Sequence, residues 1–191
     1  MNAPLQRTIL SLSRRIASLT VAFMSLGFGN LFGETSREYD VKAAFLYNFI
    51  TFTEWPADAF SSSDGPYVIG VMGDDPFGSV LDQIVTGEQI KSRPLVVRRF
   101  KRLEDMHRVH ILFLSPSEAH HLPEVLRWLK GQRILTVSDI PGFAEAGGGI
   151  EFVSDTRIKL VINPTALREA NLAVSSKLLR LAQLIPERNS P

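Results

Sequence analysis

Two adjacent carboxylates, Asp74 and Asp75, follow an apolar run over residues 67–73 that predicts a buried strand. Ser115 and Asp139 follow two further apolar runs in the same way. In an open sheet of parallel strands, ligands bind beyond the carboxyl ends of the strands, so these side chains are expected at one edge. The candidate contacts for a small ligand are Asp74, Asp75, Phe77, Ser115 and Asp139.

The acidic pair fits neither of two common phosphate chemistries. A phosphorylation receiver needs a further aspartate after a central strand, and that position here is Ser115, followed by Pro116. A dinucleotide site needs Gly-x-Gly-x-x-Gly, which is absent, and two carboxylates would repel phosphate. A purely structural interpretation also stands, in which Asp75 caps a short helix that begins at Pro76 and runs to about Val85.

The other reactive residue types do not assemble into a catalytic set. Glycines 147–149 lead into an apolar run instead of a helix, so they predict a turn that needs positive φ. The four histidines lack the spacing of a helical metal pair and are expected to be solvated or to cap helices. No nucleophile elbow and no Ser-x-x-Lys motif occurs. We therefore predict a protein that is not an enzyme, with no catalytic residue, metal site or cofactor.

Composition narrows the class of protein further. The chain has 191 residues, 45% of them hydrophobic, which is typical of one globular domain with a substantial core. It contains no cysteine, so thiol catalysis, disulfides and cysteine metal sites are excluded. Beyond residue 33 it carries 18 basic and 20 acidic side chains, and this mildly acidic balance gives no electrostatic case for nucleic acid.

The amino-terminal 33 residues have the pattern of an export signal. Arg14 and Arg15 precede an uncharged run over residues 16–32, and small residues stand where a signal peptidase cuts. We predict a cleaved signal peptide over 1–33 and a periplasmic mature protein over 34–191. The alternative is an uncleaved anchor in the inner membrane.

A helix is predicted from Asp40 through Thr53, and its aromatic side chains make it a candidate contact surface. Apolar residues lie on both of its sides, so both sides are expected to be covered, within the monomer or by a partner. Aromatic residues dominate many protein contacts, whereas burial within the monomer is the competing interpretation. The candidate partner or dimer interface consists of Phe45, Phe49, Phe52 and Trp55.

The remaining chain alternates strand and helix patterns without an internal repeat or a linker. Strands are predicted over 67–73, 94–100, 109–115 and 133–138, with a hairpin over 149–163. Helices are predicted over 117–130, with Ser117 as cap, and from Asn163 to about 185, bent at Asn171. This order predicts a single α/β domain with a mostly parallel central sheet, helices on both faces and an antiparallel hairpin towards one edge.

Three stretches together resemble the YfiR-like family of exported bacterial proteins over essentially the whole mature chain. They are residues 39–56 (YDVKAAFLYNFITFTEWP), residues 134–139 (ILTVSD) with Phe143 and the glycines that follow, and Ile162-Asn163-Pro164 with 175–182 (SSKLLRLA). The best-studied members carry cysteines whose disulfides tune stability and activity. This chain has none, so redox control does not carry over.

The resemblance implies a periplasmic protein, often a homodimer, that represses an inner-membrane diguanylate cyclase by contacting its periplasmic sensor region. An outer-membrane lipoprotein would relieve that repression by sequestering the repressor, and the output would be the cyclic-di-GMP level and biofilm formation. The alternative from another class is a periplasmic small-molecule binding protein that feeds a sensor or transporter through the ligand residues named above. A ligand that shifts the repressor between two states would reconcile the two interpretations.

Overall fold

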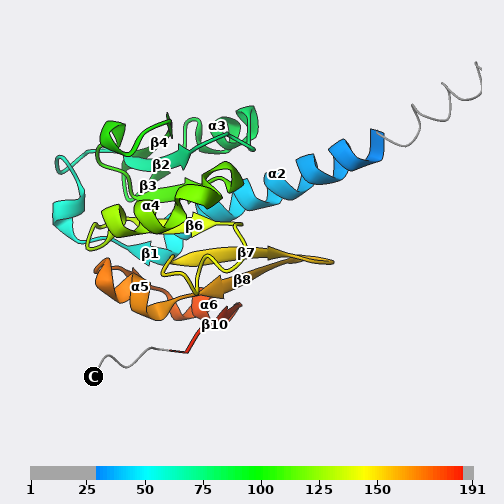
Figure 1. Ribbon diagram of the computed structural model, residues 1–191. Helices are drawn as coiled ribbons and strands as arrows, with labels where there is room; N and C mark the ends of the chain where they lie inside the picture. The colour runs from blue at the N-terminus through cyan, green and yellow to red at the C-terminus, as the bar shows by residue number, and fades with distance from the viewer. Residues whose placement is uncertain (1–28, 187–191) are drawn as a thin grey trace, which may run out of the picture. The chain divides into compact units, whose positions relative to one another are not determined.

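The computed structural model describes residues 29–186, with side chains from residue 37 onward (Figure 1). The chain divides into two compact units, Met1–Glu38 and Tyr39–Pro191, and what is described of the first is helical from Gly29. Residues 1–28, which hold most of the predicted export signal, lie outside the described residues. Within the described part, no helix is both long and apolar enough to span a membrane.

The second unit alternates short strands with helices along the chain. The helices are α2 (Gly29–Phe52), α3 (Ser79–Val85), α4 (Leu122–Leu129), α5 (Pro164–Glu169) and α6 (Ser176–Leu179), with 3-10 turns at Ala57–Ala59, Leu103–Asp105 and Pro116–His121. The strands are β1 (Thr53–Glu54), β2 (Tyr67–Met72), β3 (Gln89–Ile90), β4 (Arg93–Phe100), β5 (Ile111–Leu114), β6 (Leu135–Ser138), β7 (Ile150–Ser154), β8 (Ile158–Ile162), β9 (Ala173–Val174) and β10 (Ala182–Leu184).

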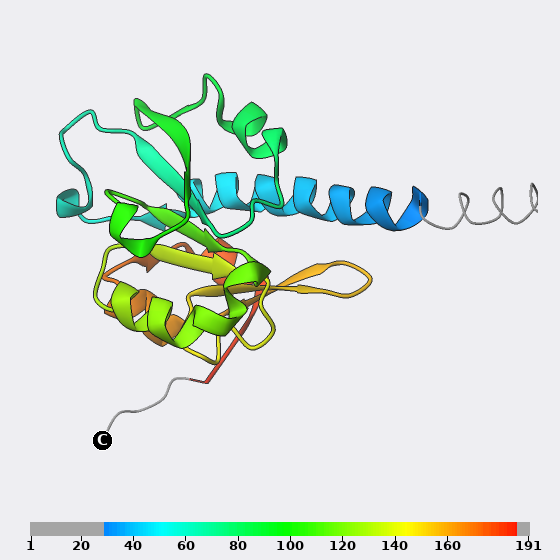
Figure 2. The same ribbon diagram turned by 45° about the horizontal axis from the view of Figure 1, so that its top comes forward.

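Eight of the strands form one sheet in the order β10-β8-β7-β6-β5-β2-β4-β3. The run from β4 to β7 is parallel throughout, whereas β7 and β8 form an antiparallel hairpin, as predicted. The hairpin extends beyond the neighbouring strands in Figure 2. The predicted α/β fold with a mostly parallel sheet is confirmed.

Helices cover the sheet on both faces, because the strands have apolar side chains on both sides. One core joins α2, α3, α5 and α6 to one face, with Phe49, Leu81 and Phe113 among its fully buried members. The other core packs α4 and the segment before β5 against the opposite face through Val125 and Leu112. Near-continuous apolar strands such as β2 and β5 are buried at every position, as parallel strands covered twice must be.

Helix α2 is longer than predicted and is covered on one side. It is already helical at Gly29, the first described residue, whereas the prediction began at Asp40, and no proline interrupts residues 29–40. Its inner side lies in the core, and Val41 and Ala44 on the other side are exposed, so the monomer does not cover the whole helix. The buried inner residues are Lys42, Ala43, Leu46, Phe49 and Ile50.

The predicted closing helix to residue 185 is wrong. Helix α5 begins as expected at Pro164, with the Asn163 side chain accepting a hydrogen bond from the Ala166 amide at 3.1 Å. It ends at Glu169, because Asn171 adopts the left-handed conformation with φ of 55°. The chain then pairs β9 with β1, forms α6 and adds β10 in parallel to β8.

Candidate functional site

The five predicted ligand residues lie at the end of the sheet where its central strands have their carboxyl ends. Strands β2, β5 and β6 are adjacent and parallel, so the segments that follow their last residues emerge together. The order of the strands reverses between β2 and β5, since β4 lies on one side of β2 and β5 on the other. Such a reversal is where open α/β sheets leave a crevice for ligands.

In this chain the crevice beyond β2 and β5 is occupied by its own next turn. The Ser117 hydroxyl accepts a hydrogen bond from the Asp74 amide at 2.9 Å. Gly73 has φ of 89°, and a Cβ there would clash with the side chains of Ser117 and Glu118, because it would overlap Ser117 Oγ and lie 2.8 Å from Glu118 Oε1. Ser115, and not Ser117, is the cap of the 3-10 turn that precedes α4, and its side chain is buried. Ser115 and the Asp74 amide therefore make their hydrogen bonds within the chain and are not free to bind a ligand.

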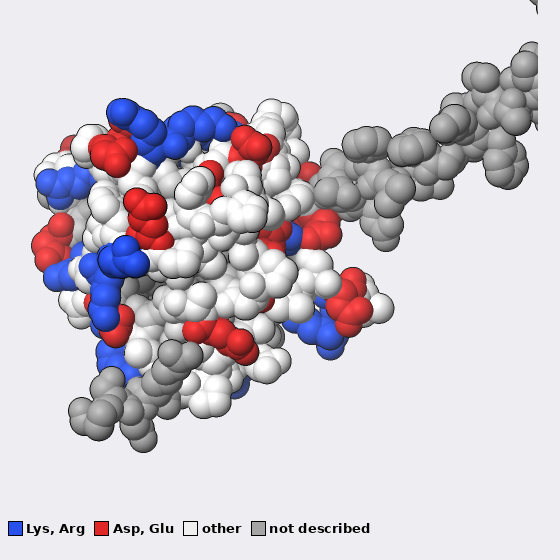
Figure 3. Space-filling view, viewed as in Figure 1, with Lys and Arg blue, Asp and Glu red and all other residues white. Residues whose placement is uncertain are grey.

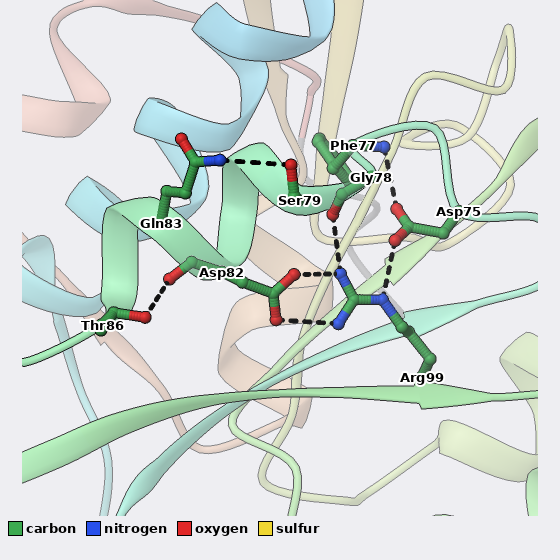
Figure 4. Close-up of polar contacts among 8 residues, drawn as sticks. All are labelled: Asp75, Phe77, Gly78, Ser79, Asp82, Gln83, Thr86 and Arg99. Carbon is green, nitrogen blue, oxygen red and sulfur yellow. Dashed lines mark hydrogen bonds and ion pairs between the residues drawn. The ribbon is translucent and has the colours of Figure 1, made fainter.

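Asp75 is held in a compact set of polar contacts with β4 and α3 (Figure 4). Its carboxylate accepts from the Phe77 amide at 2.8 Å and from Arg99 Nε at 2.7 Å. The same guanidinium donates to the Gly78 carbonyl at 2.8 Å and to both carboxylate oxygens of Asp82, at 2.9 and 2.5 Å. Asp75 therefore ties the loop after β2 to β4, and it does not cap α3, which begins at Ser79 with Gly78 as its cap.

These contacts set the ionisation of the groups that share Arg99. Hydrogen bonding from Arg99 lowers the pKa of Asp82, with the positive charge adding to the effect. The bond to Asp82, followed by that to Asp75, raises the pKa of Arg99. Asp82 and Arg99 therefore stay charged at neutral pH, and the cluster is a structural clamp.

A buried pair of opposite charges lies between α2 and the end of β6. Lys42 Nζ donates to Asp139 Oδ2 at 2.5 Å, with side chains 2% and 8% exposed. The Tyr39 hydroxyl donates to the same oxygen at 2.8 Å, and Lys42 Nζ lies 4.4 Å from the centre of the Tyr39 ring. The Tyr39 ring also meets Phe77 edge to face, with centroids 5.5 Å apart. Two predicted ligand residues, Phe77 and Asp139, thus share Tyr39 as a neighbour.

The second carboxylate oxygen of Asp139, Oδ1, is buried and accepts no hydrogen bond from the described residues. Lys42 and Tyr39 were not among the candidates from sequence. The spacing of Lys42, Leu46 and Phe49 contained the signal, since positions i, i+4 and i+7 share one helix face and the other two are apolar. A lysine on that face has to find a buried partner.

Three cavities, of about 400, 500 and 210 Å³, lie away from these residues. One lies between α4 and α5, one beside Trp55 and the segment after α5, and one beside Asn163 and Ile185. None of the three is lined by Asp74, Asp75, Phe77, Ser115 or Asp139. The chemistry that the strand ends support is thus charge pairing within the chain.

The four aromatic candidates for a contact surface divide into two groups. Phe49 has no exposed surface and stacks on Phe152, with centroids 5.9 Å apart, so its side chain belongs to the core. Phe45, Phe52 and Trp55 are partly exposed and pack on the rim of that core. The prediction of a contact surface continues to apply to these three.

Trp55 belongs to an aromatic cluster at the opposite ends of the strands, around His110. The rings of Trp55, Phe60 and Tyr67 lie 5.8, 4.5 and 5.3 Å from the His110 ring, centre to centre. His110 Nδ1 accepts from the Val68 amide at 3.1 Å, which places the ring proton on Nε2.

Burial lowers the pKa of His110 to about 4, with the Arg93 charge adding to the effect. The expectation of a solvated or capping histidine is therefore wrong for His110, because its ring closes the end of a core strand. The other three histidines are exposed. No group of three metal-ligating side chains occurs among residues 37–186.

The glycine turn is confirmed as a turn. Gly147 has φ of 115°, which L residues rarely adopt, and Gly148 approaches the Phe143 ring so closely that a Cβ has no room. The Glu151 carboxylate accepts from the Gly142 and Ala144 amides, each at 3.0 Å, and fixes the preceding loop.

A model of the family described as YfiR/HmsC-like matches residues 39–183 of this chain. The matched segment covers α2 from Tyr39 onward and every later element up to β10. No curated protein matches the chain.

Proposed function

Because the chain belongs to the YfiR/HmsC-like family, we propose that it is a non-catalytic periplasmic repressor of an inner-membrane diguanylate cyclase. It acts by contacting the periplasmic sensor region of that enzyme, and so lowers cyclic-di-GMP. The observation that carries the proposal is the family match over residues 39–183, which spans nearly the whole described chain.

The geometry of the strand ends favours a protein partner over a small ligand. Four of the five predicted ligand residues have a structural role within the chain, among them Asp75, which pairs with Arg99. Asp74 makes only an exposed pair with Lys101 at 3.1 Å. Phe77 is buried in the core and Ser115 caps a turn. Asp139 pairs with Lys42. A ligand at this edge would have to displace several of these contacts.

The partly exposed aromatic rim of α2 and the segment after it is the proposed contact surface for the cyclase or for a second copy of the chain. Phe45 and Phe52 are the residues to change, because their side chains reach the surface. Replacement by Ser should lower repression while the protein stays folded. Phe49→Ser serves as the contrasting variant, and it is expected to unfold the protein.

The function is tested by measuring cyclic-di-GMP in the source bacterium with and without the gene. We expect the level to rise on deletion, and to return with a copy that carries residues 1–33 but not with a copy that lacks them. The comparison of the two copies tests export to the periplasm. Overproduction of an outer-membrane lipoprotein that sequesters the repressor would raise cyclic-di-GMP again. An unchanged level on deletion would rule out the cyclase.

A further inference from the structure

Strand β4 has an open edge along most of its length. Its inner side pairs with β2 from Leu95 to Phe100, whereas on its outer side β3 pairs only with Arg93 and Pro94. One further hydrogen bond, from the Leu95 amide to the Glu88 carbonyl at 3.2 Å, closes that short ladder. From residue 96 to residue 100 no described strand lies beside the outer edge.

The direction of the backbone groups along this edge follows from two hydrogen bonds. The Phe100 carbonyl accepts from Gly73 of the β2 side at 3.2 Å, and the Leu95 amide donates towards β3. The N–H and C=O of a strand residue point to the same side, and the side alternates along the strand. The amides and carbonyls of Val97 and Arg99 therefore face outward, and among the described residues they have no backbone partner. Unpaired groups of this kind are a template for another strand.

This edge is also the most basic part of the sequence. Residues 91–108 contain seven basic and two acidic side chains, whereas the rest of the chain contains fourteen basic and eighteen acidic ones. Arg98 is exposed, and its guanidinium donates to the His107 carbonyl at a long 3.4 Å. In Figure 3, lysine and arginine side chains spread over the upper rim of the molecule, above the position of β4 in Figure 1.

The ion pairs on this surface are weak, so the charge is available to a partner. Lys101 and Asp74 are 75% and 85% exposed at their side chains, and Arg102 and Asp105 are 67% and 50% exposed. Exposed pairs of this kind are screened by water and salt. An acidic chain could therefore take the place of either carboxylate at little cost.

Two β4 edges of the same protein would place arginines opposite arginines, and like charges on paired strands repel. Self-association through this edge is thus disfavoured. The other edge strand of the sheet, β10, has no charged residue between Ala182 and Leu184, so charge does not discriminate between partners there.

We propose that the outer edge of β4, residues 96–100, binds an extended acidic segment of a partner protein as an added strand. The Val97 and Arg99 backbone groups supply the ladder, and Arg98 with Lys101 and Arg102 selects for acidic side chains. The inference deepens the proposed function, on which it rests, by naming a surface on β4 that contacts the cyclase in addition to the aromatic rim of α2.

Backbone pairing is tested apart from charge by Val97→Pro. Proline removes the outward amide of Val97 but leaves the ladder with β2 intact, because proline is tolerated at edges where the N–H faces solvent. Ala182→Pro is the matched control, since Ile185 donates to Ile162 and the Ala182 amide thus also faces outward, on the opposite edge. Arg98→Glu tests charge, with the exposed Arg127→Glu on α4 as its control.

Each variant is expressed with its export signal in the deletion strain, and cyclic-di-GMP is measured after the melting temperature and periplasmic amount are matched. We expect Val97→Pro and Arg98→Glu to leave the level as high as in the deletion strain, and both controls to restore it. If Val97→Pro fully restores the low cyclic-di-GMP level, the proposal of an added strand is overturned. This holds even if Arg98→Glu does not restore the level, because the surface would then bind an anionic lipid by charge alone. If Val97→Pro does not fold, restoration by Arg98→Glu overturns the proposal. An unchanged level on deletion instead overturns the proposed function.

Discussion

Lys42 Nζ lies 2.5 Å from Asp139 Oδ2 in the interior, although 97 residues separate the two in the chain. The contact joins the helix that opens the second unit to the carboxyl end of a central strand. A buried pair of this kind adds little net stability, because both charges lose their hydration. Removal of one partner, by contrast, leaves the other buried and unpaired.

We therefore predict that Lys42→Met lowers the free energy of unfolding by about 3–5 kcal/mol. The double variant Lys42→Met with Asp139→Leu should recover much of that loss, because no unpaired charge remains. Urea unfolding measures both. Lys159→Met is the control, because Lys159 pairs with Asp155 on the surface, and its cost should stay below about 1 kcal/mol. Equal losses in the single and double variants would contradict the pairing.

The central sheet was predictable because its signals are local. Strands such as β2 and β5 are continuous apolar runs, and Asn163-Pro164 combines a cap with a proline that fits the first helical position. The last 15 described residues were not predictable in this way. Strand β9 exists through pairing with β1 and β10 through pairing with β8, so their partners, not their own residues, select strand over helix.

The site shows the same division. Asp139 was found because its place after a strand follows from the local pattern, and the parallel order brings strand ends together. What faces Asp139 was not found, since that depends on which side of α2 meets the sheet. The sequence also does not show that the Ser117 hydroxyl accepts a hydrogen bond from the Asp74 amide, which is the contact that fills the crevice.

The His110 ring predicts a specific acid sensitivity. Its pKa is lowered from 6.5 to about 4 in the folded protein, so between these values the unfolded chain binds more protons. The free energy of unfolding should accordingly fall as the pH is lowered from about 6.5 to 4, by about 3 kcal/mol from this residue. Denaturant titrations at a series of pH values measure the slope.

His110→Asn isolates that contribution, because its side-chain oxygen can still accept from the Val68 amide while the titrating ring is gone. The variant should be less stable at pH 7 but should lose less stability on acidification than the original chain. His120→Asn, at an exposed position, should leave the slope unchanged. Identical slopes in the His110 variant and the original chain would argue against a buried neutral histidine.

Arg99 should not tolerate lysine, because a single ammonium cannot reach Asp75, Asp82 and the Gly78 carbonyl together. Arg99→Lys is expected to lower the free energy of unfolding by about 1 kcal/mol, a value kept small because Arg99 is partly exposed. Arg102→Lys is expected to change stability less than Arg99→Lys, because Arg102 is exposed and pairs with Asp105, three residues away. Thermal unfolding of the two variants side by side distinguishes a clamp from an ordinary surface pair, which would give equal shifts.

Gly73 should be less replaceable than Gly142, although both glycines have positive φ. Any L residue there meets two costs, the positive φ of 89° and the close approach of Ser117 and Glu118. Gly142 has a similar φ of 76° but no atom within 4 Å of a Cβ, so Gly142→Ala measures the backbone cost alone, about 1–2 kcal/mol. Gly73→Ala should lose more than this in urea unfolding. Adding Ser117→Gly should recover part of the difference, because the shortened side chain makes room for the methyl group. Equal costs at the two glycines would mean that the turn after β5 does not seal the crevice, and this result would favour the alternative of ligand binding at the strand ends.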